Sequence, residues 1–144
     1  MWLIMKTAPA KELHITRLAI AHGIEADCPL DVRSIPASRH TRRRITILAP
    51  LIPRIVFLKA PGLQSLPHYA MGYARDATGR LLTIPEWEYQ RFKECHQRWL
   101  EARQMAHKAG QPGKPRKPVK RQWTPETFME LAHELFGAEM EGAA

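Results

Sequence analysis

The sequence contains few of the features on which assignments from chemistry usually depend. It has only two cysteines, Cys28 and Cys95, among 144 residues, so one disulfide is the most that it could form. No stretch approaches the roughly 18 consecutive apolar residues that a membrane-spanning helix needs. The apolar stretch at residues 2–5 is short and has no basic segment before it, so it does not resemble an export signal. We therefore expect a cytoplasmic protein with reduced thiols and no membrane partner.

Arrangements of residues that support catalysis or metal binding are also missing. His133-Glu134 has no second histidine four residues later, as a zinc-protease helix requires. Neither cysteine belongs to a CxxC pair, and the seven histidines are scattered along the chain. Gly72 and Gly79 stand alone and do not form a phosphate-binding loop. The sequence predicts a protein that is not an enzyme and that has no metal site and no cofactor.

Positive charge dominates the chain and is unevenly spread. There are 22 Lys and Arg against 14 Asp and Glu, a net charge of +8. Ten basic and four acidic side chains give +6 over residues 1–60, and seven and five give +2 over 61–108. Five basic side chains give +5 over 109–122, and five acidic ones give −5 over 123–144. Basic surfaces attract polyanions through counterion release, so nucleic acid is the first candidate partner. A merely solvated surface is the alternative.

Hydrophobic spacing predicts alternating strands and helices in the first three quarters of the chain. One helix lies between Pro9 and Gly23, and a longer one runs from Pro85-Glu86 to about Lys108. The first helix has Lys11, His14 and Arg17 on its polar side and Leu13, Leu18, Ile20 and Ala21 among its apolar positions. Apolar or β-branched runs predict strands at 2–7, 30–36, 44–49, 54–59, 70–75 and 81–84. Residues 37–43 have the composition of a hairpin loop.

The C-terminal quarter differs in character from the rest. Residues 109–122 hold three prolines and two glycines, which predicts an extended basic linker. Thr124-Pro125-Glu126 is a strong start signal for an amphipathic helix that ends at Gly137. Its apolar stripe is Phe128, Leu131, Ala132, Leu135 and Phe136. This acidic tail, 123–144, needs an apolar surface, either on its own domain or on a partner that Phe128, Leu131, Leu135 and Phe136 would contact.

The most informative segment is Pro50-Leu51-Ile52-Pro53-Arg54-Ile55-Val56-Phe57-Leu58, a proline-framed turn that leads into an apolar strand. It resembles the PLFPGYVFV signature of the NusG-like N-terminal (NGN) domain family. Trp2-Leu3-Ile4-Met5 is similar to the opening strand of that domain, and the first helix and the basic hairpin follow in the family's order. Ser65-Leu66-Pro67, Gly72-Tyr73 and Ile84-Pro85-Glu86…Glu88 resemble further family elements. The resemblance covers about residues 2–95.

The resemblance implies a transcription elongation or antitermination factor that is not an enzyme. Its NGN-like α+β domain, residues 1–108, would be an antiparallel sheet flanked by helices. In the family an apolar surface binds the clamp helices of the large RNA polymerase subunit and so promotes processive transcription. By motif position the clamp-binding residues are Ile52, Pro53, Ile55, Phe57 and Tyr73. If Ile52 and Ile55 are exposed anchors, Ile55→Glu abolishes polymerase binding with little loss of thermal stability.

The chain departs from the family pattern in several places. The family usually has aromatic residues where Ile52 and Ile55 stand, and Gly or Asn where Arg54 stands. No segment matches the His-Thr-Thr motif with which some members contact the opposite side of the polymerase channel. Residues 109–144 lack the strand-rich pattern of the KOW barrel that follows the domain in NusG proteins. We therefore expect no KOW-mediated coupling to the ribosome or to Rho.

The resemblance also implies a location for the basic residues, because the family's domain lies beside upstream DNA and the non-template strand. Candidates for phosphate contacts are Lys11, Arg17, Arg39, Arg42, Arg43 and Arg44. Linker candidates, for DNA or nascent RNA, are Lys114, Arg116, Lys117, Lys120 and Arg121. The alternative function is a small RNA-binding or ribosome-associated protein. The predicted strands offer Phe57 and Tyr73 but no cluster of aromatics for stacking bases, which disfavours it.

Overall fold

Two apolar strands, β1 (Trp2–Lys6) and β5 (Ile55–Lys59), form the centre of the fold. The structure is a computed structural model of the chain, in which residues 1–59, 72–111 and 122–140 are described. The two strands pair antiparallel from Trp2↔Lys59 to Lys6↔Ile55. Strand β2 (Glu25–Asp27) pairs with the other edge of β5. Strands β6 (Gly72–Tyr73) and β7 (Thr83–Ile84) pair with the other edge of β1, so the sheet order is β2-β5-β1-β6 with β7 beside β1.

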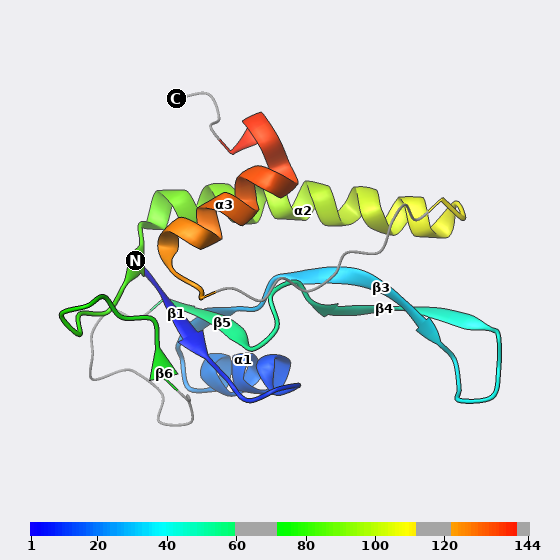
Figure 1. Cartoon of the computed structure of the whole chain (residues 1–144), viewed down its shortest axis with the longest axis horizontal. Coiled ribbons are helices and arrows are strands. Elements are labelled where there is room, and N and C mark those ends of the chain that lie inside the picture. The colour runs from blue at the N-terminus through cyan, green and yellow to red at the C-terminus, as the bar shows by residue number, and fades with distance from the viewer. Residues whose placement is uncertain (60–71, 112–121, 141–144) are drawn as a thin grey trace.

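The two faces of this sheet face different helices (Figure 1). Side chains alternate along a strand, so Trp2 and Ile4 of β1 point to the face covered by helices α2 and α3. Met5 of β1 and Val56 and Leu58 of β5 point to the opposite face, which helix α1 covers. The result is a helix–sheet–helix arrangement with an apolar cluster on each side. The predicted α+β fold with an antiparallel sheet, a long helix and a C-terminal helix is confirmed at this level.

Helix α1 (Glu12–Ala21) ends as predicted but buries a different face. Gly23 follows it with φ 77°, a left-handed conformation that suits glycine. The buried residues are Glu12, Ile15, Thr16 and Ala19. Ile20, predicted as an apolar position, is 56% exposed. The prediction was wrong because it relied on apolar spacing, whereas buried Glu12 and Thr16 form hydrogen bonds that make their burial tolerable.

Strands β3 (Leu30–Pro36) and β4 (Arg44–Pro50) form a separate two-stranded sheet, as the predicted hairpin requires. Seven pairs, from Leu30↔Pro50 to Pro36↔Arg44, hold them together. Figure 1 shows this hairpin extending away from the main sheet, along the same direction as the C-terminal half of α2.

The long helix α2 (Glu86–Lys108) has the predicted boundaries. It buries Tyr89, Phe92 and Cys95 against the sheet, at the spacing expected for one helical face. Of the strand predicted at 81–84, only Thr83–Ile84 is a strand, and the strand predicted at 70–75 begins outside the described residues. Between them the chain turns at residues 76–79, where the carboxylate of Asp76 accepts hydrogen bonds from the Thr78 and Arg80 amides. Ser65-Leu66-Pro67, one of the segments that resemble the family, lies outside the described residues.

Helix α3 (Pro125–Phe136) folds back onto its own domain, the simpler of the two predicted outcomes. The Thr124 hydroxyl accepts a hydrogen bond from the Thr127 amide, and the Thr127 hydroxyl accepts one from the Thr124 amide. A short 3-10 turn, η2 (Gly137–Glu139), follows. Most of the predicted linker lies outside the described residues, so the division into domain, linker and tail stays a prediction. In the described part of the chain, no helix is long and apolar enough to cross a membrane.

Candidate functional site

The turn before β5 is held by three backbone contacts. The Leu51 amide donates to the Pro29 carbonyl at 2.8 Å, and the Thr7 amide donates to the Arg54 carbonyl at 2.9 Å. The Arg54 amide donates to Oε1 of Glu12 at 2.9 Å. Glu12 is buried at the start of α1, so its carboxylate ties the turn to the helix below the sheet. The ends of this turn are therefore fixed relative to both β1 and α1.

Arg54 has φ 66°, in the left-handed region of backbone conformation. For a residue with a Cβ this conformation costs roughly 1–2 kcal/mol, and Gly or Asn is the usual occupant. This is the position at which the NusG-like family usually has Gly or Asn. The charge-assisted hydrogen bond from the Arg54 amide to Glu12 offsets part of the strain. Arg54 therefore adopts a turn conformation that Gly would adopt at a lower energetic cost.

Three of the five predicted clamp-binding residues lie in the core. Ile52 is 2% exposed, Ile55 3% and Phe57 0%. They share one apolar cluster with Tyr89 and Phe92 of α2 and with the apolar side of α3. The expectation that Ile52 and Ile55 are exposed anchors is wrong for this conformation. The condition under which Ile55→Glu would leave stability unchanged is therefore not met, and this substitution should destabilise the fold because it buries a carboxylate without a partner.

Pro53 and Tyr73, the other two predicted clamp-binding residues, do not lie in this buried cluster. Pro53 is half-buried in the turn. Tyr73 pairs with Met5 in the sheet and packs on the α1 side, with the cluster of Val56 and Leu58. Tyr73 therefore lies on the face opposite to Ile52, Ile55 and Phe57. The sequence could not separate them, because the side on which a strand residue points depends on the register with β1.

Helix α3 covers the face to which Ile55 and Phe57 point. The ring centroid of Phe128 lies 5.0 Å from that of Phe57 and 4.6 Å from that of Phe92. Phe136 lies 5.5 Å from Phe92, and Leu131 is buried in the same cluster. Leu135, the fourth residue predicted for partner contact, is half-buried at its edge. The stripe predicted to bind a partner thus binds the domain's own apolar face.

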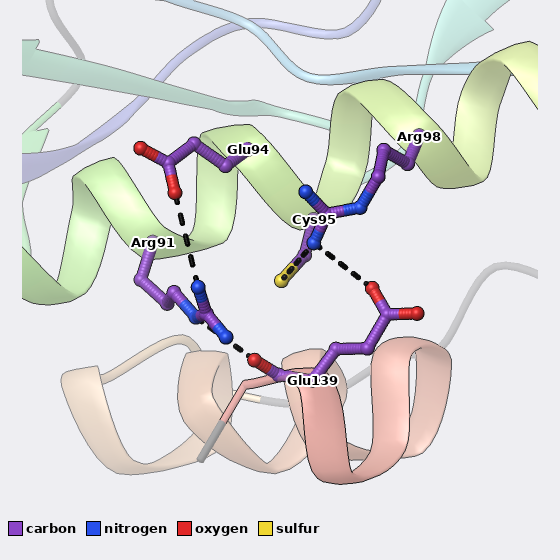
Figure 2. Close-up of polar contacts among 5 residues, drawn as sticks. All are labelled: Arg91, Glu94, Cys95, Arg98 and Glu139. Atoms are coloured by element: carbon purple, nitrogen blue, oxygen red, sulfur yellow. Dashed lines mark hydrogen bonds and ion pairs between the residues drawn. The ribbon is translucent and has the colours of Figure 1, made fainter. Parts of the chain in front are cut away.

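A polar contact holds the end of the C-terminal segment on α2 (Figure 2). Nε of Arg91 donates to the Glu139 carbonyl at 2.8 Å, and Arg98 forms an ion pair of 3.1 Å with the Glu139 carboxylate. Cys95 lies between these arginines, and its sulfur accepts a 3.8 Å contact from Arg98. Sequence analysis did not single out Arg91, Arg98 or Glu139. No local signal could have done so, because the contacts join residues 41 and 48 positions apart.

The basic hairpin places its arginines at an exposed tip. Arg39, Arg42 and Arg43 are exposed, and no carboxylate of the described residues lies within ion-pair distance of them. Arg44 differs, because its guanidinium donates to both the hydroxyl and the carbonyl of Ser34 on the opposite strand, at 2.9 and 2.8 Å. Arg44 therefore braces the two strands, and the other three remain available to a polyanion.

The base of the hairpin is anchored to α2. Arg103 donates to both carboxylate oxygens of Asp31, at 2.6 and 3.4 Å, and its guanidinium lies 4.9 Å from the ring centre of Trp99. His96 donates from Nε2 to the Leu30 carbonyl at 2.7 Å. The Asp31 carboxylate also accepts the Val32 amide at 2.7 Å. These contacts determine the direction in which the hairpin leaves the domain.

The remaining predicted basic residues do not join the hairpin tip. Lys11 and Arg17 are exposed on or beside α1, on the opposite side of the main sheet from α2 and α3 (Figure 1). The five basic residues predicted for the linker, 114–121, lie outside the described residues. Of the described residues predicted to contact phosphates, Arg39, Arg42 and Arg43 lie in the loop of the β3–β4 hairpin, are exposed and form no ion pair with a described carboxylate.

Several buried groups in the described part of the chain have raised pKa values. Burial, together with the negative charges of Glu12 and Asp27, raises the pKa of Cys28 to about 12. Burial also raises the pKa of Tyr89, whose hydroxyl donates to Asp27 at 2.6 Å. Within the described ranges, no group of three or more His, Cys, Asp or Glu side chains could hold a metal ion.

Comparison with known proteins provides no assignment. No protein-family model matches the chain, and no curated protein matches it. The geometry of the turn, the covered apolar face and the basic hairpin therefore carries the functional argument.

Proposed function

We propose that this protein is a NusG-like transcription elongation or antitermination factor that binds the clamp helices of RNA polymerase and promotes processive transcription. The observation that carries the proposal is the left-handed Arg54, which occupies the position of the family's Gly or Asn. Gly favours a left-handed conformation, so a left-handed backbone at this position is what a motif with Gly there would require, and this supports the proposal.

The covered face supports the proposal in a second way. The family's partner is a pair of helices, and the face containing Ile55 and Phe57 already accepts one amphipathic helix, α3. A face that packs against a helix has the shape and apolar character that another helix needs. Binding of the clamp helices there requires α3 to move away, because Phe128 occupies the space over Phe57.

The alternative function, an RNA-binding or ribosome-associated protein that uses its sheet, has less support. Recognition of RNA by a sheet requires aromatic side chains exposed on the central strands. Phe57 is fully buried and Tyr73 packs on the α1 side. Helices cover both faces of the main sheet in the described structure, which leaves no open platform for stacked bases.

The test is binding of the full chain to purified core RNA polymerase, together with a variant that loosens α3. Glu139→Ala removes the carboxylate that pairs with Arg98, a contact at the surface, without creating a hole in the core. We expect the wild type to bind and Glu139→Ala to bind up to about fivefold more tightly, because an exposed ion pair contributes at most about 1 kcal/mol to holding α3 on its face. Glu101→Ala, which removes an exposed charge from α2, is the matched control and should bind like the wild type.

The outcomes distinguish the parts of the proposal. Failure of the wild type and of Glu139→Ala to bind core polymerase would refute the polymerase-binding function. If both bind equally, polymerase binding stands but the site lies elsewhere than under α3. Binding of RNA alone, without polymerase, would favour the alternative function.

A further inference from the structure

The β3–β4 hairpin forms an arm on the domain that is anchored to α2 only near its base. In the described part of the chain its strands pair with each other and with no third strand. At about 3.3 Å per residue, a strand of this length spans roughly 20 Å. Figure 1 shows the tip reaching well beyond the main sheet. The loop 37–43 is therefore the part of the domain best placed to enter a partner.

The charge of this arm has one sign. From Val32 to Pro53 the sequence contains five arginines and His40 but no Asp or Glu. Three of the arginines, at positions 39, 42 and 43, are exposed and form no ion pair with a described carboxylate. Positive charge that no nearby carboxylate neutralises attracts a polyanion. The arm has no aromatic residue of the Phe, Tyr or Trp type between Leu30 and Pro50, so it offers no platform on which single-stranded bases could stack.

The arm is also ordered before any partner arrives. At the tip the Ala37 amide donates to the Arg43 carbonyl at 2.8 Å, and the Arg43 amide donates to the Thr41 hydroxyl at 3.1 Å. Arg44 braces the strands through Ser34, and the anchor to α2 fixes the base. Less conformational entropy is then lost on binding.

We propose that the β3–β4 hairpin enters the major groove of B-form DNA, with Arg39, Arg42 and Arg43 on the phosphates that line it. The B-form major groove is about 12 Å wide and admits a two-stranded β-ribbon, whereas the minor groove is about 6 Å wide. The major groove of A-form RNA is too narrow for protein side chains to read. Exposed Ile45 on β4, close to the tip, is an apolar group suited to contact a thymine methyl. This proposal rests on the nucleic-acid part of the proposed function. Its test contains no polymerase, so DNA binding by the hairpin and polymerase binding by the domain can fail separately.

The first experiment compares the full chain on a 20-base-pair DNA duplex, an RNA duplex of the same sequence and the single DNA strand. We expect the DNA duplex to bind at least tenfold more tightly than the other two. Arg42→Ala/Arg43→Ala should lower the salt exponent on duplex DNA by about 1.8, since each phosphate contact contributes roughly 0.9. When salt is raised from 50 to 200 mM, the fold-loss of affinity of the wild type should therefore be about 12 times that of the variant. Lys6→Ala/Arg80→Ala removes the same charge from exposed positions away from the arm and should keep the wild-type exponent.

The second experiment identifies the groove. Methylation of guanine N7 places a group in the major groove and should weaken binding, whereas a small ligand that fills the minor groove should not compete. The proposal is overturned if the double variant keeps the wild-type exponent, if it loses as much on the RNA duplex or single strand, or if the minor-groove ligand competes. Absence of any DNA binding at 50 mM salt also overturns it.

Discussion

The ion pair between Asp31 and Arg103 is the joint between the hairpin and α2, and it can be tested from both sides. Arg103→Met removes the charge but keeps an apolar side chain that still packs on Trp99. Asp31→Asn removes the opposite charge and keeps an acceptor for the Val32 amide. Both changes remove the same ion pair with little change in side-chain volume.

The expected cost follows from burial. The side chain of Asp31 is 10% exposed and that of Arg103 is 20% exposed. Removing one partner of a buried pair costs about 3–5 kcal/mol, and access of water to Arg103 reduces this. Arg103→Met leaves the less exposed charge without its partner, so we expect it to lower the free energy of unfolding by about 2–3 kcal/mol. Asp31→Asn should cost about 1–2 kcal/mol, because the guanidinium that remains can reach water.

The assay is urea unfolding of the wild type, the two single variants and the double variant. The two changes should be coupled by about 1–2 kcal/mol, since each removes the same interaction. The midpoint of thermal unfolding of Arg103→Met should fall by roughly 6–10 °C for a chain of this size. Coupling below about 0.5 kcal/mol would refute the structural role of the pair.

Binding of duplex DNA gives a readout that charge alone does not predict. Asp31→Asn raises the net charge by one, so general electrostatics predicts tighter binding. If the pair positions the hairpin, both Asp31→Asn and Arg103→Met should weaken binding several-fold, with a salt exponent close to that of the wild type. Tighter binding by Asp31→Asn would show that the anchor does not position the arm.

Three further changes test local features. Arg54→Gly should raise the free energy of unfolding by about 0.5–1 kcal/mol in urea, because relief of the left-handed strain exceeds the added chain entropy; a loss of stability would contradict the strain. Thr124→Ala removes the side chain that caps α3 and should cost about 1 kcal/mol, seen as roughly fivefold faster hydrogen exchange of α3 amides with α1 unchanged. The pKa of Asp76 is lowered, chiefly by the hydrogen bond from the Thr78 hydroxyl. The ionised carboxylate therefore stabilises the fold at neutral pH, and this stabilisation is lost as the pH falls below about 3.9, the pKa of an unperturbed Asp. Amide NMR shifts of residues 78–80 should follow this titration, and Asp76→Asn should abolish it.

Features with a local cause were predictable. The boundaries of α2 follow from Pro85 and from the helical spacing of Tyr89, Phe92 and Cys95. The start of α3 follows from Thr124 and Pro125, and its apolar stripe is the face that packs. The hairpin follows from two apolar runs separated by a polar loop. In each case the determining contacts lie within a few residues, so the pattern is visible in the letters.

Features that depend on distant partners were not predictable. Strand β2, Glu25–Asp27, has no apolar pattern and is a strand because the edge of β5 is available to it. The burial of Glu12 depends on the Arg54 amide, 42 positions away. Tyr73 faces α1 because its register with Met5 places it there, and a shift of one residue would have reversed it.

The sequence by itself therefore determined which segments are apolar, where the long helices begin and end, and that an arginine-rich loop joins two strands. It also determined that the C-terminal helix needs an apolar surface, because its stripe cannot remain in water without cost. Only the tertiary structure decided which surface that is. Ile55 and Phe57 point to the α3 side because side chains alternate along β5, and Ile52 lies buried in the same cluster. Packing Phe128 against Phe57 removes both rings from water at once, a gain that exists only when segments some 70 residues apart meet.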